Sequence, residues 1–377
     1  MHPDTRAVHL TRFTDQNAGA IAPPIYLSTT FERAADGTLP HGYLYTRAGN
    51  PNRTVLEKAL AELEGGTEAL VFGSGQAALT ALLQTLRPGD HVLAAPDTYY
   101  ASLVLMREVF EPWGLSWSTC DLSDPAAVRA ALRPTTRLIW VETPSNPQLR
   151  LIDIAAVAAL AHEVGARCAV DNTWATPVLQ QPLSLGADVV MHSVTKYFGG
   201  HSDVLGGALV LRDDPDLAAR LRSIQTLTGG VLAPFDCWLI TRGIQTLPLR
   251  VRAQAGTAAV LAHWLTTHPA VERVYYPGLP AHPGHEIARR QMRGGFGGML
   301  SFDVRGGFDA ARRVAGAVRV FRRATSLGGV ESLIEHRRPV EGPESTSPEG
   351  LLRLSVGLEH ADDLRADLDQ ALRRTEL

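Results

Sequence analysis

Short apolar runs, separated by polar and turn-forming residues, recur along the first two thirds of the chain. Cys168–Val170 is followed directly by Asp171, and the run Asp188–Met191 comes shortly before Lys196. Short, β-prone runs of this kind are typical of buried strands in a parallel sheet with a crossover between them. Because ligands of such sheets bind beyond the carboxyl ends of the strands, Asp171 and Lys196 are predicted to border one binding site.

Helical patterns lie between the predicted strands. Asn50 and Pro51 are typical of a helix start, and the apolar positions that follow share one face as far as Gly65–Gly66. A second helix is predicted to begin at Gly75–Gln76, after a strand and the turn GSG. The free N–H groups at this helix start would suit a phosphate, although such a turn alone usually serves only as a tight connection.

The first 40 residues differ from the rest of the chain. Residues 1–40 are rich in proline, threonine, alanine and glycine, and their apolar positions show weak periodicity. We therefore expect an extended arm there rather than an element of the core.

The composition narrows the class of protein. The 377 residues are 45% apolar and 20% charged, as in a soluble globular protein with two domains or one large and one small domain. A net charge of −3 gives no electrostatic reason to expect nucleic acid or an anionic membrane as a partner, and the apolar runs are shorter than a membrane span. Cys120, Cys168 and Cys237 lack metal or disulfide spacing, which favours a reduced, cytosolic setting. His282 and His285 lie three residues apart without an evident third ligand, so no metal site is expected.

Lysine is rare in this chain. Only two of the 36 basic residues are lysines, Lys58 and Lys196, and the others are arginines. A chain that otherwise uses arginine for positive charge has a lysine where it needs an amine that can lose its proton. Lys58 has acidic neighbours on an exposed helix face, which favours a solvated ion pair. Lys196 is therefore the candidate for covalent chemistry, and a Schiff-base lysine would meet that need.

The stretches VDNTW and HSVTKYFGGHSD, which contain Asp171 and Lys196, resemble the Cys/Met-metabolism family of pyridoxal-phosphate (PLP) enzymes. The resemblance extends from about Ala22 to the C-terminus. It implies an α/β fold of the PLP-dependent transferase type I, similar to aspartate aminotransferase, with a large, mostly parallel sheet domain and a smaller C-terminal α/β domain. It also implies an inter-subunit arm at 1–40, a PLP-binding domain at 41–233, and a C-terminal domain with a linking helix at 234–377.

The resemblance implies a role for each motif residue. Lys196 would hold PLP and move protons, Asp171 would pair with its pyridine nitrogen, and Tyr99 would stack on its ring as a third catalytic residue. Other expected cofactor contacts are Tyr45, Arg47, Gly75, Gln76, Asn146, Thr173, Ser193 and Thr195. Tyr45 and Arg47 would reach the PLP phosphate of the adjacent subunit. From the residues alone, Tyr45 and Arg47 also fit a surface loop, Tyr99 fits core packing, and Ser193 and Thr195 fit local backbone capping.

The expected substrate-binding residues are Ser326, Arg353 and Thr325. Arg353 would bind the substrate α-carboxylate through a two-pronged contact. Thr325 stands where relatives usually have an acidic residue, and Val104 stands where an arginine for a distal carboxylate is expected. Ala101 replaces the cysteine of methionine γ-lyases, and RRPVEGPEST replaces the usual stretch after His336. Arg107 and Arg337–Arg338 are the cations that remain for a distal carboxylate.

We therefore expect an enzyme of transsulfuration that catalyses γ- or β-elimination, or γ-replacement, on cystathionine, related sulfur amino acids or activated homoserine. Cystathionine γ-lyase and γ-synthase are the preferred activities, and methionine γ-lyase and O-acetylhomoserine sulfhydrylase are the alternatives. A catalytically inactive PLP-fold binding protein is a more remote alternative. The resemblance further implies a homotetramer of two catalytic dimers with shared active sites, in the cytoplasm, with a small amino-acid substrate and neither nucleic acid nor membrane as a partner.

Overall fold

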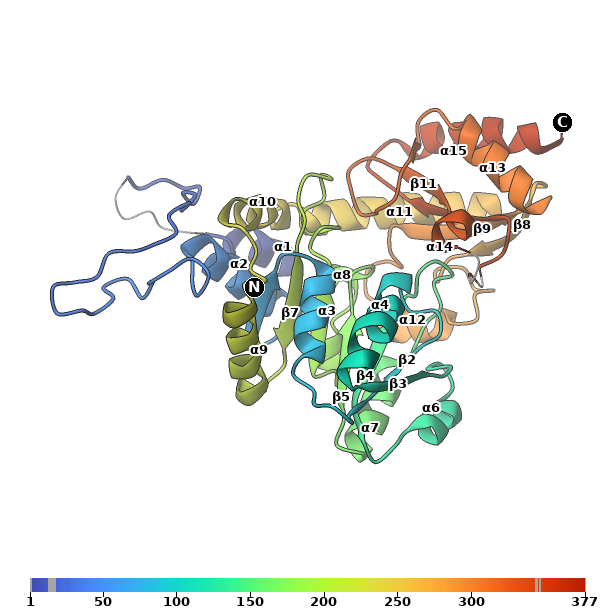
Figure 1. Ribbon diagram of the computed structural model, residues 1–377. Helices are drawn as coiled ribbons and strands as arrows, with labels where there is room; N and C mark the ends of the chain where they lie inside the picture. Colours follow the sequence, from blue (N-terminus) through green and yellow to red (C-terminus); the bar gives the residue numbers. More distant parts are fainter. Residues whose placement is uncertain (1, 13–17, 343–344, 346, 377) are drawn as a thin grey trace.

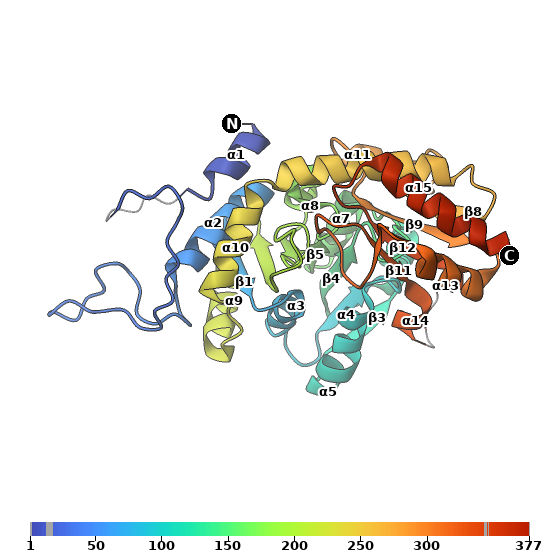
Figure 2. The same cartoon turned by 90° about the horizontal axis from the view of Figure 1, so that it is seen from above.

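The computed structural model describes residues 2–12, 18–342, 345 and 347–376. Two sheets form its framework, and the long helix α11 (Leu247–Leu265) runs from one to the other (Figures 1 and 2). The first sheet consists of β1 (Glu68–Phe72), β2 (His91–Ala94), β3 (Ser116–Thr119), β4 (Thr136–Glu142), β5 (Arg167–Asp171), β6 (Val189–His192) and β7 (Gly207–Leu211). The second sheet consists of β8 (Val271–Tyr275), β9 (Met299–Val304), β10 (Arg322–Arg323), β11 (Leu333–His336) and β12 (Leu351–Ser355).

The first sheet is mostly parallel, as predicted. Its strand order is β1-β7-β6-β5-β4-β2-β3, and β7 alone runs antiparallel to its two neighbours. The two strands predicted around Asp171 and Lys196 are present as β5 and β6, which pair in parallel. Asp188 lies just outside β6, where its carboxylate accepts the backbone N–H of Cys168. The carboxyl ends of β4, β5 and β6 therefore lie together at one edge.

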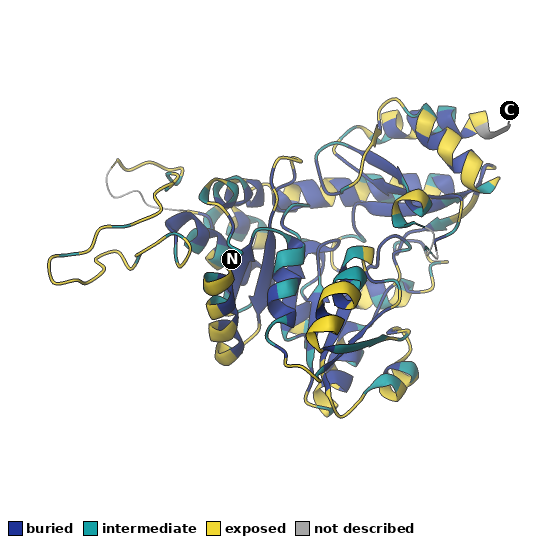
Figure 3. Ribbon diagram, viewed as in Figure 1, coloured by how far each residue is buried: buried dark blue, intermediate teal, exposed yellow. Residues whose placement is uncertain are grey.

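Successive residues of the central strands pack on opposite faces, which explains why the runs are apolar throughout. Ala169 packs with α3, η1 and α9, whereas Cys168 and Val170 pack with α6 and α7 on the other face. Figure 3 shows the strands as the buried centre of the molecule and the outer sides of the helices as exposed. The helices around this sheet are α2 (Pro51–Glu64), α3 (Gly75–Leu83), α4 (Tyr100–Leu105), η1 (Met106–Phe110), α5 (Glu111–Trp113), α6 (Pro125–Ala131), α7 (Ile154–Glu163), α8 (Thr176–Leu179), η2 (Pro182–Leu185), α9 (Pro215–Thr228) and α10 (Pro234–Ile244).

The second sheet has the order β10-β11-β12-β9-β8 and is antiparallel except for the short pair β10–β11. Its core is shared with α11, α13 and α15. Glu335 of β11 pairs in register with Arg353 of β12, which places two charged side chains opposite each other. The remaining helices are α12 (His285–Gln291), α13 (Gly307–Ala317), α14 (Arg337–Glu341), α15 (Ala361–Leu372) and η3 (Arg373–Glu376).

The N-terminal segment differs from the expectation for residues 1–40. Pro3–His9 forms helix α1, and Ala7 is fully buried, so an extended arm was wrong for these residues. Local signals explain the helix, because Pro3 stands in its first turn and the side chain of His2 accepts the N–H of Asp4. Beyond 13–17, which lie outside the described residues, the chain projects from the body without a helix until α2 (Figures 1 and 2). That this arm packs on another subunit, and the domain bounds after 40 and 233, stay predictions.

Candidate active site

Four predicted site residues meet at the junction of the two sheets. Lys196, in the turn after β6, donates from Nζ to the hydroxyl of Ser326 at 2.8 Å. The guanidinium of Arg353 donates to the carbonyl oxygen of Ser326 at 3.1 Å and to Oδ1 of Asn146 at 3.0 Å. Ser326 has a φ of 107°, a left-handed conformation that costs a residue other than glycine about 1–3 kcal/mol. Such strain at a cluster of polar groups is typical of a functional site.

The amine of Lys196 lies in an environment that favours its neutral form. Burial and the nearby Arg353 guanidinium lower the pKa of Lys196 to about 8, while Glu335 opposes this shift. A neutral amine is nucleophilic and can accept a proton, and both properties are needed by a lysine that forms a covalent bond to a carbonyl. The position is therefore suited to covalent chemistry near neutral pH.

Asp171 and Glu142 end neighbouring strands at the same edge of the first sheet. Asp171 accepts the backbone N–H of Thr173 at 3.0 Å, and Glu142 accepts that of Tyr99 at 2.7 Å. Burial raises the pKa of Asp171, and burial together with Asp171 raises the pKa of Glu142 well above its usual value. The edge can thus accommodate a positively charged group beside Asp171, which would relieve the crowding of the two carboxyl groups. The side chain of Tyr99 is 41% exposed at this edge.

The start of α3 forms a tight cradle next to the turn that carries Lys196. A Cβ added at Gly75 would lie 3.2 Å from the Cβ of Ser193, and one added at Gly207 would lie 2.1 Å from the carbonyl oxygen of Ser74. Ser193 donates its backbone N–H to the hydroxyl of Thr173 at 2.9 Å. The backbone of α3 therefore approaches this turn as closely as glycine allows.

Two further predicted residues border the cradle. Gln76 donates to the hydroxyl of Ser102 at 3.4 Å, and its Oε1 is buried without a partner among the described residues. The hydroxyl of Thr195 donates to the carbonyl oxygen of Gly206 and accepts its N–H, so Thr195 is engaged in the local capping that the sequence left open.

Tyr45 and Arg47 are not brought to this cluster within one chain. Arg47 donates to the carbonyl oxygen of Thr226 in α9 at 2.5 Å, and its guanidinium lies 5.7 Å from the ring centre of Tyr45. Tyr45 is 45% exposed. Within the described part of the chain, neither side chain has a hydrogen bond to Lys196 or Asp171.

Sequence reasoning missed Glu335, which connects Thr325 to Arg353. Oε1 of Glu335 accepts from the hydroxyl of Thr325 at 2.6 Å, and Oε2 accepts from Arg353 at 2.7 Å and from Arg337 at 2.6 Å. Arg337 also donates to Glu341 at 3.1 Å. Arg337 is thus already paired and does not offer the free cation that the sequence suggested for a distal carboxylate. Side chains two residues apart in a strand point to the same face, so Glu335 shares the face of the apolar residue Leu333. This position could have indicated Glu335 as a buried carboxylate.

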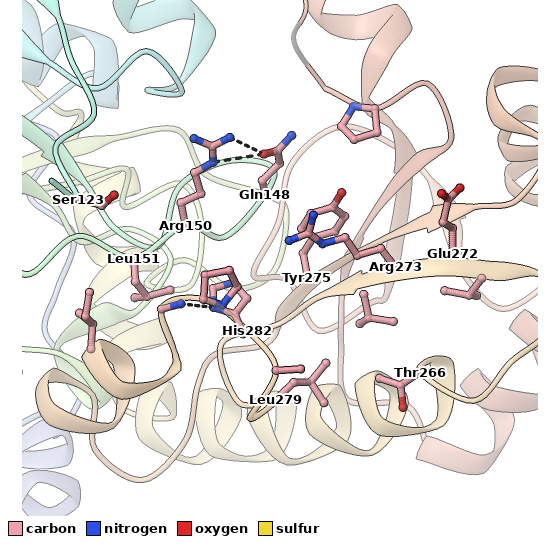
Figure 4. A pocket seen from close by; sticks show the side chains of 17 residues that line it. Ser123, Gln148, Arg150, Leu151, Thr266, Glu272, Arg273, Tyr275, Leu279 and His282 are labelled. Carbon is pink, nitrogen blue, oxygen red and sulfur yellow. Dashed lines mark hydrogen bonds between the residues drawn. The ribbon is translucent and has the colours of Figure 1, made fainter.

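Val104 lines a cavity of about 200 Å³ whose other walls include Asn146, Arg107 and Glu341. Val104, at the position where an arginine is expected, therefore lines the same cavity as Asn146, which accepts a hydrogen bond from Arg353. A larger cavity, of about 800 Å³, lies elsewhere between the two sheets, and Arg150, Arg273 and Tyr275 line it (Figure 4). It contains none of the predicted site residues, so chemistry rather than size identifies the candidate site.

The residues at the sheet edge fit PLP. Lys196 supplies an amine, Asp171 a half-buried carboxylate, and the start of α3 with Ser193 supplies donors beside a backbone that leaves no room for a Cβ at Gly75 or Gly207. A mostly parallel sheet with this lysine and aspartate at its carboxyl edge is the architecture of a PLP-dependent enzyme of fold type I.

Comparisons with known proteins agree with this class. A family model described as "Cys/Met metabolism PLP-dependent enzyme" matches residues 4–373. A cystathionine gamma-synthase of Mycobacterium tuberculosis is 50% identical over 376 residues, which cover 98% of this chain and 96% of that protein. A cystathionine beta-lyase of Coxiella burnetii is 43% identical over 382 residues, which cover 98% of each protein. A solved cystathionine gamma-lyase structure from Micromonospora echinospora is 44% identical, with 99% of both chains covered and a TM-score of 0.94.

The chain therefore belongs to the Cys/Met metabolism family of PLP-dependent enzymes. The predicted family, fold type and cofactor are confirmed. Among the described residues, no helix is both long enough and apolar enough to cross a membrane.

Replacing Gly207 with alanine is expected to weaken PLP retention about tenfold and to lower the melting temperature. The new Cβ would lie 2.1 Å from the carbonyl oxygen of Ser74, so the start of α3 would have to move at a cost of about 1–3 kcal/mol. Gly256→Ala is the matched control, because a Cβ there meets nothing within 4 Å. PLP titration of the apoprotein by absorbance and a thermal melt would test this. Equal behaviour of the two variants would exclude the close approach of α3 as a requirement.

Covalent capture of PLP by the apoprotein is expected to depend on pH with a midpoint near 8. The amine must be neutral to attack, and the pKa of Lys196 is about 8 instead of the usual 10.5. Borohydride reduction at a series of pH values, followed by peptide mapping, measures the fraction labelled at Lys196. A midpoint above pH 10, or label chiefly on Lys58, would contradict the assignment.

Proposed function

We propose that this chain is a transsulfuration enzyme with cystathionine γ-synthase or cystathionine γ-lyase activity, acting on cystathionine or on an activated homoserine. The observation that carries the proposal is the cluster of Lys196, Ser326 and Arg353, which sets a proton-accepting amine beside a cation suited to an α-carboxylate. The 50% identity to a cystathionine gamma-synthase over nearly the whole chain supports the same substrate class.

The cofactor, when bound, supplies an electron sink that makes the protons next to the substrate amine acidic. In the proposed mechanism Asp171 would hold the ring nitrogen protonated, and Tyr99 would stack on the ring. Thr173, Gly75, Ser193, Gln76 and Thr195 would complete the cradle. Asn146 would also contact the cofactor, and it accepts a hydrogen bond from Arg353.

Arg353 binds the α-carboxylate of the substrate and so orients its Cα toward Lys196. The amine of Lys196 would then accept the Cα proton, and its pKa of about 8 would allow it to return that proton at a neighbouring atom. The hydroxyl of Ser326 receives a hydrogen bond from this amine and keeps it on the substrate side. Loss of a group from Cβ or Cγ gives elimination, and attack by a thiol gives replacement.

The distal end of the substrate distinguishes the activities of the relatives. We assign the cavity beside Val104 to this end, because it adjoins Asn146. Thr325 and Val104 are both neutral. Arg107, in the wall of the cavity, pairs with Glu108, and Arg337 and Arg338 donate to other residues of the chain. The enzyme should therefore discriminate between cystathionine and smaller sulfur amino acids less strictly than an enzyme with a dedicated distal cation.

We further propose a homotetramer of two catalytic dimers in the cytoplasm. The arm before α2 projects from the body (Figure 1). Tyr45 and Arg47 precede α2 by a few residues, Arg47 donates to α9, and neither side chain has a hydrogen bond to Lys196 among the described residues. In a dimer these two residues would reach the cofactor phosphate of the adjacent subunit, which would make the active site a property of the interface.

A substrate panel tests the activity. The purified holoenzyme is incubated with cystathionine, methionine, homocysteine, cysteine and O-acyl-homoserines, and keto acids and sulfur products are both measured. We expect turnover of cystathionine, or of an O-acyl-homoserine with cysteine, and a ratio of kcat/KM for cystathionine over homocysteine within about a hundredfold, since one placed polar contact changes such a ratio by only about 1–3 kcal/mol. No turnover of any of these substrates by PLP-loaded protein would favour the inactive binding protein instead.

Shared active sites predict complementation between two inactive variants. Arg47→Ala lacks the donor to the neighbouring site, and Lys196→Ala lacks the amine in its own site. Half of randomly mixed dimers are hybrids with one intact site, so about a quarter of the parent activity should return. Mass spectrometry of the mixture measures the exchange of subunits. No recovery after proven exchange would place both residues in the site of their own subunit.

A further inference from the structure

The carboxylate of Glu335 accepts hydrogen bonds from three side chains. Its side chain is 7% exposed, and it accepts hydrogen bonds from Thr325, Arg337 and Arg353 at 2.6, 2.6 and 2.7 Å. The two arginines pair with the same oxygen, Oε2, while Thr325 occupies Oε1. A buried carboxylate with this many donors is fixed in place and stays ionised.

Arg337 is as deeply buried as its partner. Its side chain is 5% exposed, and its Nε donates a hydrogen bond to Glu341 at 3.1 Å. Glu341 in turn accepts the hydroxyls of Ser345 and Ser347 at 2.5 and 2.7 Å. Four charges of alternating sign thus follow one another from Arg353 through Glu335 and Arg337 to Glu341, and they sum to zero.

Thr325 and Arg337 meet at this one carboxylate. Thr325 is neutral and donates to Glu335, whereas an acidic residue at position 325 would place a second negative charge beside it. Arg337, the first residue after β11, adds a positive charge at the other oxygen. Both residues therefore stabilise the same negative charge next to Arg353.

Arg353 has limited capacity left for a ligand. Asn146 takes one N–H of Nη1, and the carbonyl oxygen of Ser326 and Glu335 take both N–H groups of Nη2. The N–H of Nε and one N–H of Nη1 remain for a ligand. The charge of Glu335 opposes an incoming carboxylate, and Arg337 offsets that charge. The proximity of Arg337 also contributes, after burial, to lowering the pKa of Arg353 to about 10.

We propose that Arg337 and Thr325 act through Glu335 as positioning residues that set the affinity of Arg353 for the substrate α-carboxylate. This inference rests on the proposed role of Arg353 in carboxylate binding. Without Arg337, the full negative charge of Glu335 would fall on Arg353 and weaken its hold on the substrate. Loss of Arg337 should therefore raise KM and leave kcat nearly unchanged.

The test compares two probes that differ only in a carboxylate, L-alanine and ethylamine, bound to the holoenzyme and followed by calorimetry. Arg337→Met is expected to weaken L-alanine binding about tenfold, the size of one contact to a buried charge, and ethylamine binding less than about twofold. Arg338→Met is the matched control, because this neighbouring arginine donates to the carbonyl oxygen of Ser347 and should change neither affinity. Arg337→Lys keeps the charge and should restore L-alanine binding to within about threefold of the parent.

A double-mutant cycle separates positioning from damage to the fold. Adding Glu335→Gln to Arg337→Met should recover part of the lost L-alanine affinity, because the neutral amide no longer opposes the carboxylate. Equal weakening of both probes, or additive losses in the double variant, would overturn the inference. Arg353→Lys tests the underlying assignment separately. If that variant binds L-alanine like the parent, Arg353 does not hold the carboxylate, and the proposed substrate geometry is wrong.

Discussion

The hydrogen bond from Lys196 to Ser326 is the contact on which the candidate site depends, because it joins the edge of the first sheet to a loop of the second. Ser326 has an unfavourable positive φ, and it is held there by Lys196 at its hydroxyl and by Arg353 at its carbonyl oxygen. Arg353 reaches back to Asn146 beside the first sheet. A relative movement of the two sheets would therefore disturb the amine of Lys196 and the guanidinium of Arg353 together, so both sheets must be fixed for the site to exist.

Burying this many charges is costly, and the two sheets meet this cost in different ways. Asp171 and Glu142 crowd one sheet edge, where backbone N–H groups of Thr173 and Tyr99 support them. On the second sheet Arg353 pairs with Glu335, and Arg337 links Glu335 to Glu341. The two solutions differ in kind. The first leaves a negative edge that suits a protonated ring nitrogen, and the second gives a neutral wall from which only part of one guanidinium remains available.

The sequence predicted the features that depend on local patterns. The apolar runs at β5 and β6, the cap at Asn50 and the rarity of lysine all concern neighbouring residues, and the strands and the α2 start are present as predicted. Helix α1 was missed because its short cap signal lies in a segment of weak periodicity. Glu335 was missed because its partners Thr325, Arg337 and Arg353 meet through strand register, and a single sequence gives no information on which strands pair.

The relatives carry three different names at similar identity, which has a physical explanation in this site. In the proposed mechanism Lys196, Asp171 and Arg353 act on parts that all these activities share, so they do not distinguish a lyase from a synthase. On the same proposal, discrimination comes from the far end of the substrate, which we assign to the cavity that Val104 lines. Arg107, in the wall of this cavity, pairs with Glu108, and Arg337 pairs with Glu335; an ion pair that is already satisfied offers little to a distal carboxylate. On this proposal the charges of the site act on the end that all these substrates share, and the shape of the small cavity is left to separate them.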